Sequence, residues 1–208
     1  LIKDWLKYQV IGHTRDDAVG EAFDKVARML GLPYPGGPEI SKLAAEYEAN
    51  LKHKKRTIVL PRPMIFSKDF DFSFSWLKTA VLYTIKKLPE LTEEIKKEIA
   101  YEFEQAVVEV LAKKTKRAIE EYKPKTVIIG GGVIANKKIR ETFQKFVGDL
   151  PKTKLLIPHL KYSTDNATMI GIAGYFRWLD QSASPADPPK RRKRINRSFK
   201  ATGNLVLK

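Results

Sequence analysis

The sequence predicts an α/β fold, and three features of its second half carry that prediction. Residues 126–129 form a compact run of Thr, Val and Ile, which is typical of a buried strand. Three consecutive glycines follow at 130–132, and a helix is expected to begin near Asn136. Residues 154–157 then predict a second strand, joined in parallel to the first by a right-handed crossover.

Helical spacing of apolar residues predicts helices along most of the remaining chain. One is expected from Val19 to Leu30, followed by Gly31 as a natural stop. The longest should begin near Thr92, carry acids in its first turn where they suit the helix dipole, and end before Pro124. Others are expected at 39–49, 75–87 and 164–178.

The segments between these helices favour strands, caps and loops. Residues 7–12 and 58–60 favour short strands, and Thr14 followed three residues later by Asp17 fits a capping box. Residues 33–38 contain three prolines and two glycines, so they are expected to form a shaped loop rather than a regular element.

The charge balance points to a polyanionic partner. The 208 residues carry 39 Lys and Arg against 24 Asp and Glu, a formal net charge of +15. From residue 181 onward there are eight basic residues and a single acid, and this tail is expected to be disordered. Because neutralising phosphates releases counterions, nucleic acid is the first interpretation. An ordinary basic soluble protein is the alternative.

Composition also limits the cell compartment and the kinds of site. The absence of cysteine excludes disulfides and thiolate metal ligands, and it fits a reducing cytoplasm. No apolar stretch is long enough to span a bilayer, so no membrane role is expected. The sequence begins at Leu1 without a secretory signal, and we expect it to be a fragment of a longer protein.

The glycines at 130–132 are the first candidate site. A strand, a glycine turn and a helix start together present outward-facing backbone N–H groups, an arrangement that suits a phosphate or a nucleotide. Asn136 could read a base, because its amide both donates and accepts hydrogen bonds. A tight turn between strand and helix, with Asn136 as an ordinary helix cap, explains the same residues without any ligand.

Two aspartates are further candidates. Asp165 follows a predicted strand and stands at a predicted helix start, where its carboxylate could hold a metal or merely favour the helix dipole. Asp24 shares a helix face with Glu21 and Lys25, so it could belong to a surface ion-pair cluster or bind ribose hydroxyls. The three histidines are far apart and exclude a His-Glu-x-x-His zinc site within this chain.

Several long motifs occur together in one order and resemble a single family. The bacterial transferases that form threonylcarbamoyladenosine in tRNA, formerly called O-sialoglycoprotein endopeptidases or glycoproteases, are similar to residues 1–178. The stretches that carry the resemblance are DDAVGEAFDKVARMLGLPYPGGP at 16–38, PRPM at 61–64, DFSFSWLKTA at 71–80, GGVIAN at 131–136 and STDNATMI at 163–170.

The resemblance implies the C-terminal half of such an enzyme. Its fold would be an actin/Hsp70-like (ribonuclease H-like) α/β lobe, with helices packed on a mixed sheet and incomplete without the N-terminal lobe. Residues 1–180 would form the C-terminal part of that domain, and 181–208 a basic tail outside the family pattern. The reaction implied is transfer of threonylcarbamoyl from threonylcarbamoyl-AMP to the exocyclic amine of the adenosine next to the anticodon, in tRNAs reading codons that begin with A.

The resemblance also implies roles for individual residues. Asp24 and Gly37 would contact the ribose and adenosine side of the adenylate, and Gly131, Gly132 and Asn136 would line the nucleotide. Asp165 would be one ligand of a divalent metal, iron with zinc as the alternative. No residue is assigned as a catalytic nucleophile. The implied partners are tRNA, threonylcarbamoyl-AMP, a paralogous actin-like subunit and a small ATPase, all in the cytoplasm.

Three departures from the family pattern bear on activity. The His-rich metal motif and the Ser-Gly-Gly-His-Thr phosphate loop, both expected upstream, are missing, so this half alone is expected to be inactive. Trp76 stands where the family has Gly and should perturb packing or fill an opened space. The competing interpretations are a non-catalytic tRNA- or partner-binding half, an actin/Hsp70-like ATPase and, least favoured, a metalloprotease.

Overall fold

The computed structural model describes residues 1–4, 7–51, 56–163 and 165–182, and it confirms the α/β class. The chain divides into two compact units, one made of residues 11–164 and the other of residues 1–10 with the segment that starts at Asp165. Within the described residues, no helix combines the length and apolar character that a membrane crossing requires.

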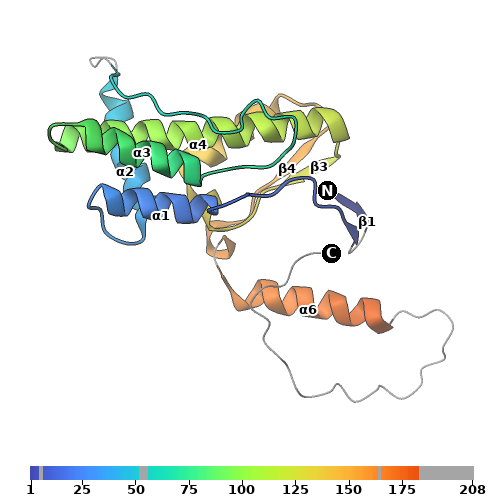
Figure 1. The fold of residues 1–208 in the computed structure, drawn as a ribbon. Coiled ribbons are helices and arrows are strands. Elements are labelled where there is room, and N and C mark those ends of the chain that lie inside the picture. The colour runs from blue at the N-terminus through green and yellow to red at the C-terminus, as the bar shows by residue number, and fades with distance from the viewer. Residues whose placement is uncertain (5–6, 52–55, 164, 183–208) are drawn as a thin grey trace. The chain divides into compact units, whose positions relative to one another are not determined.

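Four helices build most of the larger unit (Figure 1). The bounds are α1 Val19–Met29, α2 Gly36–Ala49, α3 Ser75–Lys87 and α4 Glu93–Tyr122. Gly31 adopts a positive φ of 72°, which lets the chain turn after α1, as the sequence predicted. Thr92 caps α4, because its side chain accepts a hydrogen bond from the backbone N–H of Ile95.

The apolar faces of these helices form one core. Phe23 of α1 and Phe103 of α4 meet edge to face, with ring centroids 5.0 Å apart. Leu77 and Val81 of α3 are fully buried in the same cluster. Burial of such side chains stabilises the unit by roughly 1.5–3 kcal/mol each, which explains why the helical pattern of apolar residues predicted these elements correctly.

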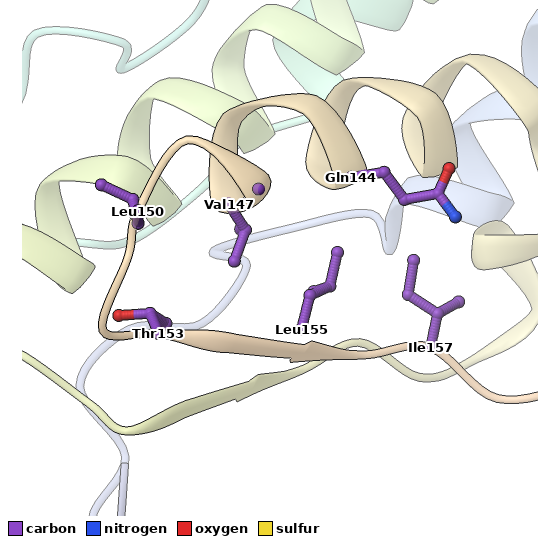
Figure 2. Close-up of a pocket in the computed structure, with 7 residues that line it drawn as sticks. Gln144, Val147, Leu150, Thr153, Leu155 and Ile157 are labelled. Carbon is purple, nitrogen blue, oxygen red and sulfur yellow. The ribbon is translucent and has the colours of Figure 1, made fainter.

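A parallel strand pair completes the larger unit. Strand β3 (Thr126–Ile128) pairs in parallel with β4 (Lys154–Leu156), which confirms the predicted parallel pairing. The expectation that residues 126–129 form a buried strand was wrong, because β3 is only partly buried and Ile128 is 62% exposed. Between them lie the 3₁₀ helix η2 (Gly132–Ala135) and α5 (Lys137–Gly148), and a second 3₁₀ helix, η3 (Leu160–Tyr162), follows β4. Figure 2 shows α5 lying over β4, with Leu155 and Ile157 pointing toward the helix across a cavity of about 360 Å³.

Two local predictions were wrong. Residues 58–60 are extended but do not belong to a sheet; the backbone N–H groups of Thr57 and Ile58 donate to Glu98 of α4, and that of Leu60 donates to Glu102. Helix side chains therefore take the place of a neighbouring strand. Thr14 does not cap α1, because its hydroxyl donates to the carbonyl of Asp17 and the cap position is Ala18.

The loop expected at 33–38 is shorter than predicted. Helix α2 begins at Gly36, directly after the cis peptide bond between Tyr34 and Pro35. Pro38 lies in the first turn of α2, where a missing N–H costs no helical hydrogen bond. Gly37 consequently lies in the first turn of α2 rather than in a loop.

The smaller unit contains a hairpin and one helix. Strand β1 (Ile2–Asp4) pairs antiparallel with β2 (Lys7–Tyr8), and α6 spans Ala167–Ser182. The described strands thus form two separate two-stranded sheets, one antiparallel and one parallel. The tail that was expected to be disordered lies outside the described residues from 183 onward.

Candidate functional site

Asp24 and the start of α2 form the first part of the site. Asp24 lies on α1, and its Oδ1 accepts a hydrogen bond of 2.8 Å from the backbone N–H of Gly36. A Cβ atom at Gly36 would lie 2.5 Å from the Cβ of Ala27 and 2.9 Å from the Cα of Asp24, so only glycine allows α2 to begin this close to α1. Space is open beside Gly37, where a Cβ would meet nothing within 4 Å.

The neighbouring charges on α1 form a separate cluster. Lys25 pairs with Glu21 at 2.7 Å and with Asp17 at 2.7 Å, and Lys78 of α3 also pairs with Asp17 at 2.9 Å. Burial disfavours the charge on Asp17, but the bonds from both lysines outweigh it and lower the pKa of that carboxyl. The ion-pair interpretation therefore holds for Glu21 and Lys25, whereas Asp24 bonds to the start of α2.

The glycine segment lies beside the start of α1. Gly131 has a positive φ of 89°, and a Cβ atom would meet nothing within 4 Å at Gly131 or at Gly132. Val133 of η2 approaches Gly20, whose Cβ position would lie 3.3 Å from a methyl carbon of Val133. The glycine segment thus offers open backbone beside the first turn of α1.

Asn136 connects three helices through its side-chain amide. Its Oδ1 accepts a hydrogen bond of 2.9 Å from the N–H of Ile139 and so caps α5, which confirms the capping interpretation. Its Nδ2 donates to the hydroxyl of Ser41 on α2 at 2.8 Å and to Glu104 on α4 at 2.6 Å. Both ends of the amide are therefore engaged within the protein.

Glu104 is the buried acid behind this amide. It is only 5% exposed, and burial raises the pKa of its carboxyl, although the hydrogen bonds from Asn136 and Ser41 act in the opposite direction. The sequence did not single out Glu104 or Ser41. The burial of Glu104 could have been predicted from the apolar pattern of α4. Glu104 directly follows Phe103 and stands about one helical turn before Val107, and both of these residues are buried.

Asp16 is a second acid that was missed. It accepts hydrogen bonds from the Ser73 hydroxyl and from the backbone N–H groups of Phe74, at 2.9 Å, and Ser75, at 3.0 Å. Desolvation opposes its ionisation, but these three bonds prevail and lower the pKa of the carboxyl. Asp16 thereby joins the loop before α1 to the start of α3, where Trp76 is 71% exposed and takes no room in the core.

Most predicted site residues therefore come together in the larger unit. The start of α2, with Gly37, lies against Asp24 in the middle of α1, whereas the glycine segment and η2 lie beside the first turn of α1. Asn136, between η2 and α5, bonds to Ser41 of α2. Backbone N–H groups at helix starts, together with a carboxylate, are suited to the phosphate and ribose of a nucleotide.

Asp165 belongs to the other unit and is exposed. In the part of the chain that the structure describes, no three His, Cys, Asp or Glu side chains gather closely enough to hold a metal ion. Asp165 alone therefore does not fit a transition metal, which needs three or four protein ligands.

The comparisons with known proteins agree with the motif resemblance. The family model described as "TsaD: tRNA N6-adenosine threonylcarbamoyltransferase" matches residues 1–172. A protein of that name from Thermosipho africanus is 49% identical over 175 residues, which cover 84% of this chain and 51% of that protein.

Two further relatives carry the same name. The one from Geobacillus thermodenitrificans is 48% identical and covers 81% of this chain and 47% of its own length. The one from Lactobacillus acidophilus is 45% identical, with 84% and 49% covered. This chain spans about half the length of these curated relatives, and it belongs to the tRNA N6-adenosine threonylcarbamoyltransferase family.

Proposed function

We propose that this chain is the nucleotide-holding part of an enzyme that transfers threonylcarbamoyl from threonylcarbamoyl-AMP to tRNA. The acceptor would be the exocyclic amine of the adenosine next to the anticodon, in tRNAs that read codons beginning with A. The family match over residues 1–172 carries this proposal. Such a reaction belongs in the cytoplasm, and the lobe would be of the actin/Hsp70-like kind.

The adenylate would lie along α1, between the start of α2 and the glycine segment that precedes η2. Asp24 would accept hydrogen bonds from the ribose hydroxyls with the carboxylate oxygen that does not bond Gly36. Gly37 would let the nucleotide approach the backbone closely, since no side chain fills that space. The backbone N–H groups of Gly131 and Gly132 would face its phosphate. Asn136, fixed by its own hydrogen bonds, would present a rigid surface beside it.

In the proposed reaction the amine nitrogen attacks the carbamoyl carbon of the mixed anhydride. A C–N bond forms, the bond from that carbon to the phosphate oxygen breaks, and AMP leaves as the amine gives up a proton. Firm binding of the phosphate and ribose would hold the anhydride in place for this attack. The family's divalent metal, iron or zinc, would find a single donor here in Asp165, so we derive no step through it.

The chain alone is expected to bind the nucleotide and tRNA without transferring the group. It spans about half the length of its relatives, which favours a binding half completed by further residues. Its net charge of +15 suits a tRNA partner. An actin-like subunit and a small ATPase remain the proposed protein partners.

The proposal can be tested in a chimera in which this chain replaces the matching half of the Thermosipho africanus relative. With threonylcarbamoyl-AMP and tRNA, we expect threonylcarbamoyladenosine to appear in the nucleoside digest of the tRNA. Asp24→Ala should weaken the apparent affinity for threonylcarbamoyl-AMP by about tenfold, because a charge-assisted hydrogen bond contributes roughly 1.5–3 kcal/mol.

The matched control is Glu21→Ala, which removes a carboxylate from the same helix without touching the start of α2. This variant should retain the parent affinity. Equal effects of the two substitutions would contradict the assigned role of Asp24. If no modified nucleoside forms and the rate of ATP hydrolysis is the same with and without tRNA, the ATPase interpretation would be favoured instead.

A further inference from the structure

A groove of about 840 Å³ lies between α4, α5 and the loop that contains residues 62–66. Its lining is mainly apolar, with basic side chains among the apolar ones. The apolar members are Ile65, Phe66, Val108, Ala112 and Phe146. A groove that is apolar and basic together suits a ligand with flat apolar groups and negative charge.

Phe66 is the most prominent side chain of this groove. It is 81% exposed, and the Nζ atom of Lys113 lies 4.0 Å from its ring centroid. The loop beneath the ring is held in place by Arg62, whose guanidinium donates to Glu109 at 2.7 and 3.0 Å and also binds Glu102. An exposed aromatic ring on an anchored loop, next to a cation, is the arrangement on which proteins stack an unpaired base.

Two of the positive charges in the groove have no carboxylate partner within the described residues. Lys113 and Lys116 are exposed on successive turns of α4, and within the described ranges neither lies within ion-pair distance of a carboxylate. Arg62, the other basic group of the lining, is already paired with Glu102 and Glu109. Two lysines one helical turn apart can contact neighbouring phosphates of one strand.

The groove also begins close to the candidate site. Asn136 caps α5, and Thr142 and Phe146 line the groove six and ten residues further along that helix, roughly 9 and 15 Å away by helix rise. On α4, Gln105 of the lining directly follows Glu104, which binds Asn136. A strand of a few nucleotides could therefore reach from one place to the other.

We propose that this groove binds an unpaired stretch of RNA, with a base stacked on Phe66 and its phosphates contacting Lys113 and Lys116. This deepens the proposed function, on which the identity of the RNA as a tRNA rests. The groove would hold nucleotides that neighbour the modified adenosine. An acidic protein segment is the competing occupant, and the unpaired lysines beside a single projecting ring favour the RNA.

The test measures binding of a fluorescent RNA stem-loop and a fully paired RNA duplex to the complete 208-residue chain. Phe66→Ala should weaken stem-loop binding by about tenfold or more, because base stacking on an aromatic ring contributes that much, and leave duplex binding unchanged. Lys113→Gln with Lys116→Gln should reduce the slope of log affinity against log salt by about 1.4, the value for two contacts with a single strand.

The matched control is Lys86→Gln with Lys87→Gln, which removes the same charge from exposed lysines at the end of α3 and leaves the basic tail intact. If both double variants weaken stem-loop binding equally, the attraction is diffuse and the proposal is wrong. It is equally wrong if Phe66→Ala binds the stem-loop like the parent, or if Phe66→Ala instead abolishes binding of a fluorescent oligoglutamate peptide. Thermal melting checks that each variant is folded.

Binding of AMP to the same variants separates this inference from the proposed function. The groove variants should keep the AMP affinity of the parent, while Asp24→Ala should weaken AMP binding by about tenfold. If the chain does not bind AMP but binds the stem-loop through Phe66, the proposed function is contradicted and the proposal that the groove binds RNA stands. If AMP binding depends on Asp24 but stem-loop binding is unchanged in Phe66→Ala, only the proposal for the groove is contradicted.

Discussion

The side-chain amide of Asn136 depends on a buried acid for its position. Glu104→Gln keeps an acceptor for the Asn136 Nδ2 and a partner for Ser41, so we expect AMP binding to persist. Glu104→Ala leaves the Nδ2 of Asn136 without that acceptor and opens a cavity, and it should cost about 2–3 kcal/mol of unfolding free energy. Chemical denaturation of both variants measures the difference, and equal losses would contradict the role of the acceptor.

Glu104 also makes stability depend on pH. Its pKa is higher in the folded chain than the ordinary value of 4.5, because burial disfavours the charged form. The stability it contributes is therefore fully present below about 4.5 and is lost as the pH rises through the raised pKa. Glu104→Gln has no such titration, so its unfolding free energy relative to the parent should increase with pH. A difference that stays constant with pH would contradict this prediction.

Asp16 should show the opposite dependence. Its pKa is lowered below 3.8 in the folded chain, so the stability from its bonds to Ser73, Phe74 and Ser75 is present above that value and lost as the pH falls through the folded pKa. Asp16→Ala should cost roughly 2 kcal/mol at neutral pH and less in acid. Asp149→Ala, at an exposed position, is the control and should change stability little.

For single residues, the sequence predicted the position in a helix better than the hydrogen-bond partners. The spacing placed Asn136 at a helix start, and its alternatives were a ligand or a cap. The structure shows the cap, together with two further partners on α2 and α4 that lie 95 and 32 residues away in the sequence. No local pattern contains such contacts, so Ser41 could not be found in advance.

At the scale of elements, α4 holds the loop that follows the RNA-binding candidate Phe66. Lys114 is almost fully buried, donates to the Ser67 hydroxyl at 2.7 Å and also binds the carbonyl of Asp71. Arg117 binds the carbonyls of Ser67 and Asp69. Three loop carbonyls, those of Ser67, Asp69 and Asp71, are thus held by two side chains of one helix.

Lys114→Met should loosen this loop while keeping the apolar stem. Burial lowers the pKa of Lys114, while its bond to Asp69 acts in the opposite direction, and its Nζ supplies the loop with hydrogen bonds. We expect amide hydrogen exchange across residues 67–72 to become at least about tenfold faster, which corresponds to about 1.4 kcal/mol of lost local stability. Lys86→Met, at an exposed position, should leave exchange in that loop unchanged.

Element prediction succeeded where burial decides and failed where side chains replace a sheet. Helices α3 and α4 follow from apolar periodicity, since each buries a face that the pattern shows. The parallel strands follow from compact apolar runs, but they are only partly buried. Residues 58–60 have the composition of a strand but bind Glu98 and Glu102 about forty residues later. A strand partner and a helix carboxylate satisfy the same N–H groups, so the sequence of the segment alone cannot distinguish them.

At the scale of the whole molecule, apolar side chains are exposed on both units. On the larger unit Ile128 and Leu156, paired in register, are 62% and 54% exposed. On α6, Ile170 and Ile172 are exposed as well. Since the chain spans about half the length of its relatives, we expect further residues of a complete enzyme to cover part of this surface.

The chain alone should therefore self-associate. We expect its sedimentation to depend on concentration, and Ile170→Ser with Ile172→Ser to shift it toward the monomer. Val59→Ser with Tyr34→Ser is the control, because these side chains are also exposed but lie outside the helices, in separate loops. A chain that remains monomeric at high concentration, with and without the α6 substitutions, would contradict the expectation.

Helix α4 holds both residues 57–60 and the loop at residues 67–72, and this affects how the chain folds during synthesis on the ribosome. The anchors that α4 provides for these segments, from Glu98 to Arg117, are added to the chain some 40 to 50 residues after the backbone they bind. A nascent chain that has not yet released α4 carries unsatisfied N–H and carbonyl groups in both segments. The larger unit can therefore close only late in translation, and a pause before Pro124 would leave its first half exposed to proteases.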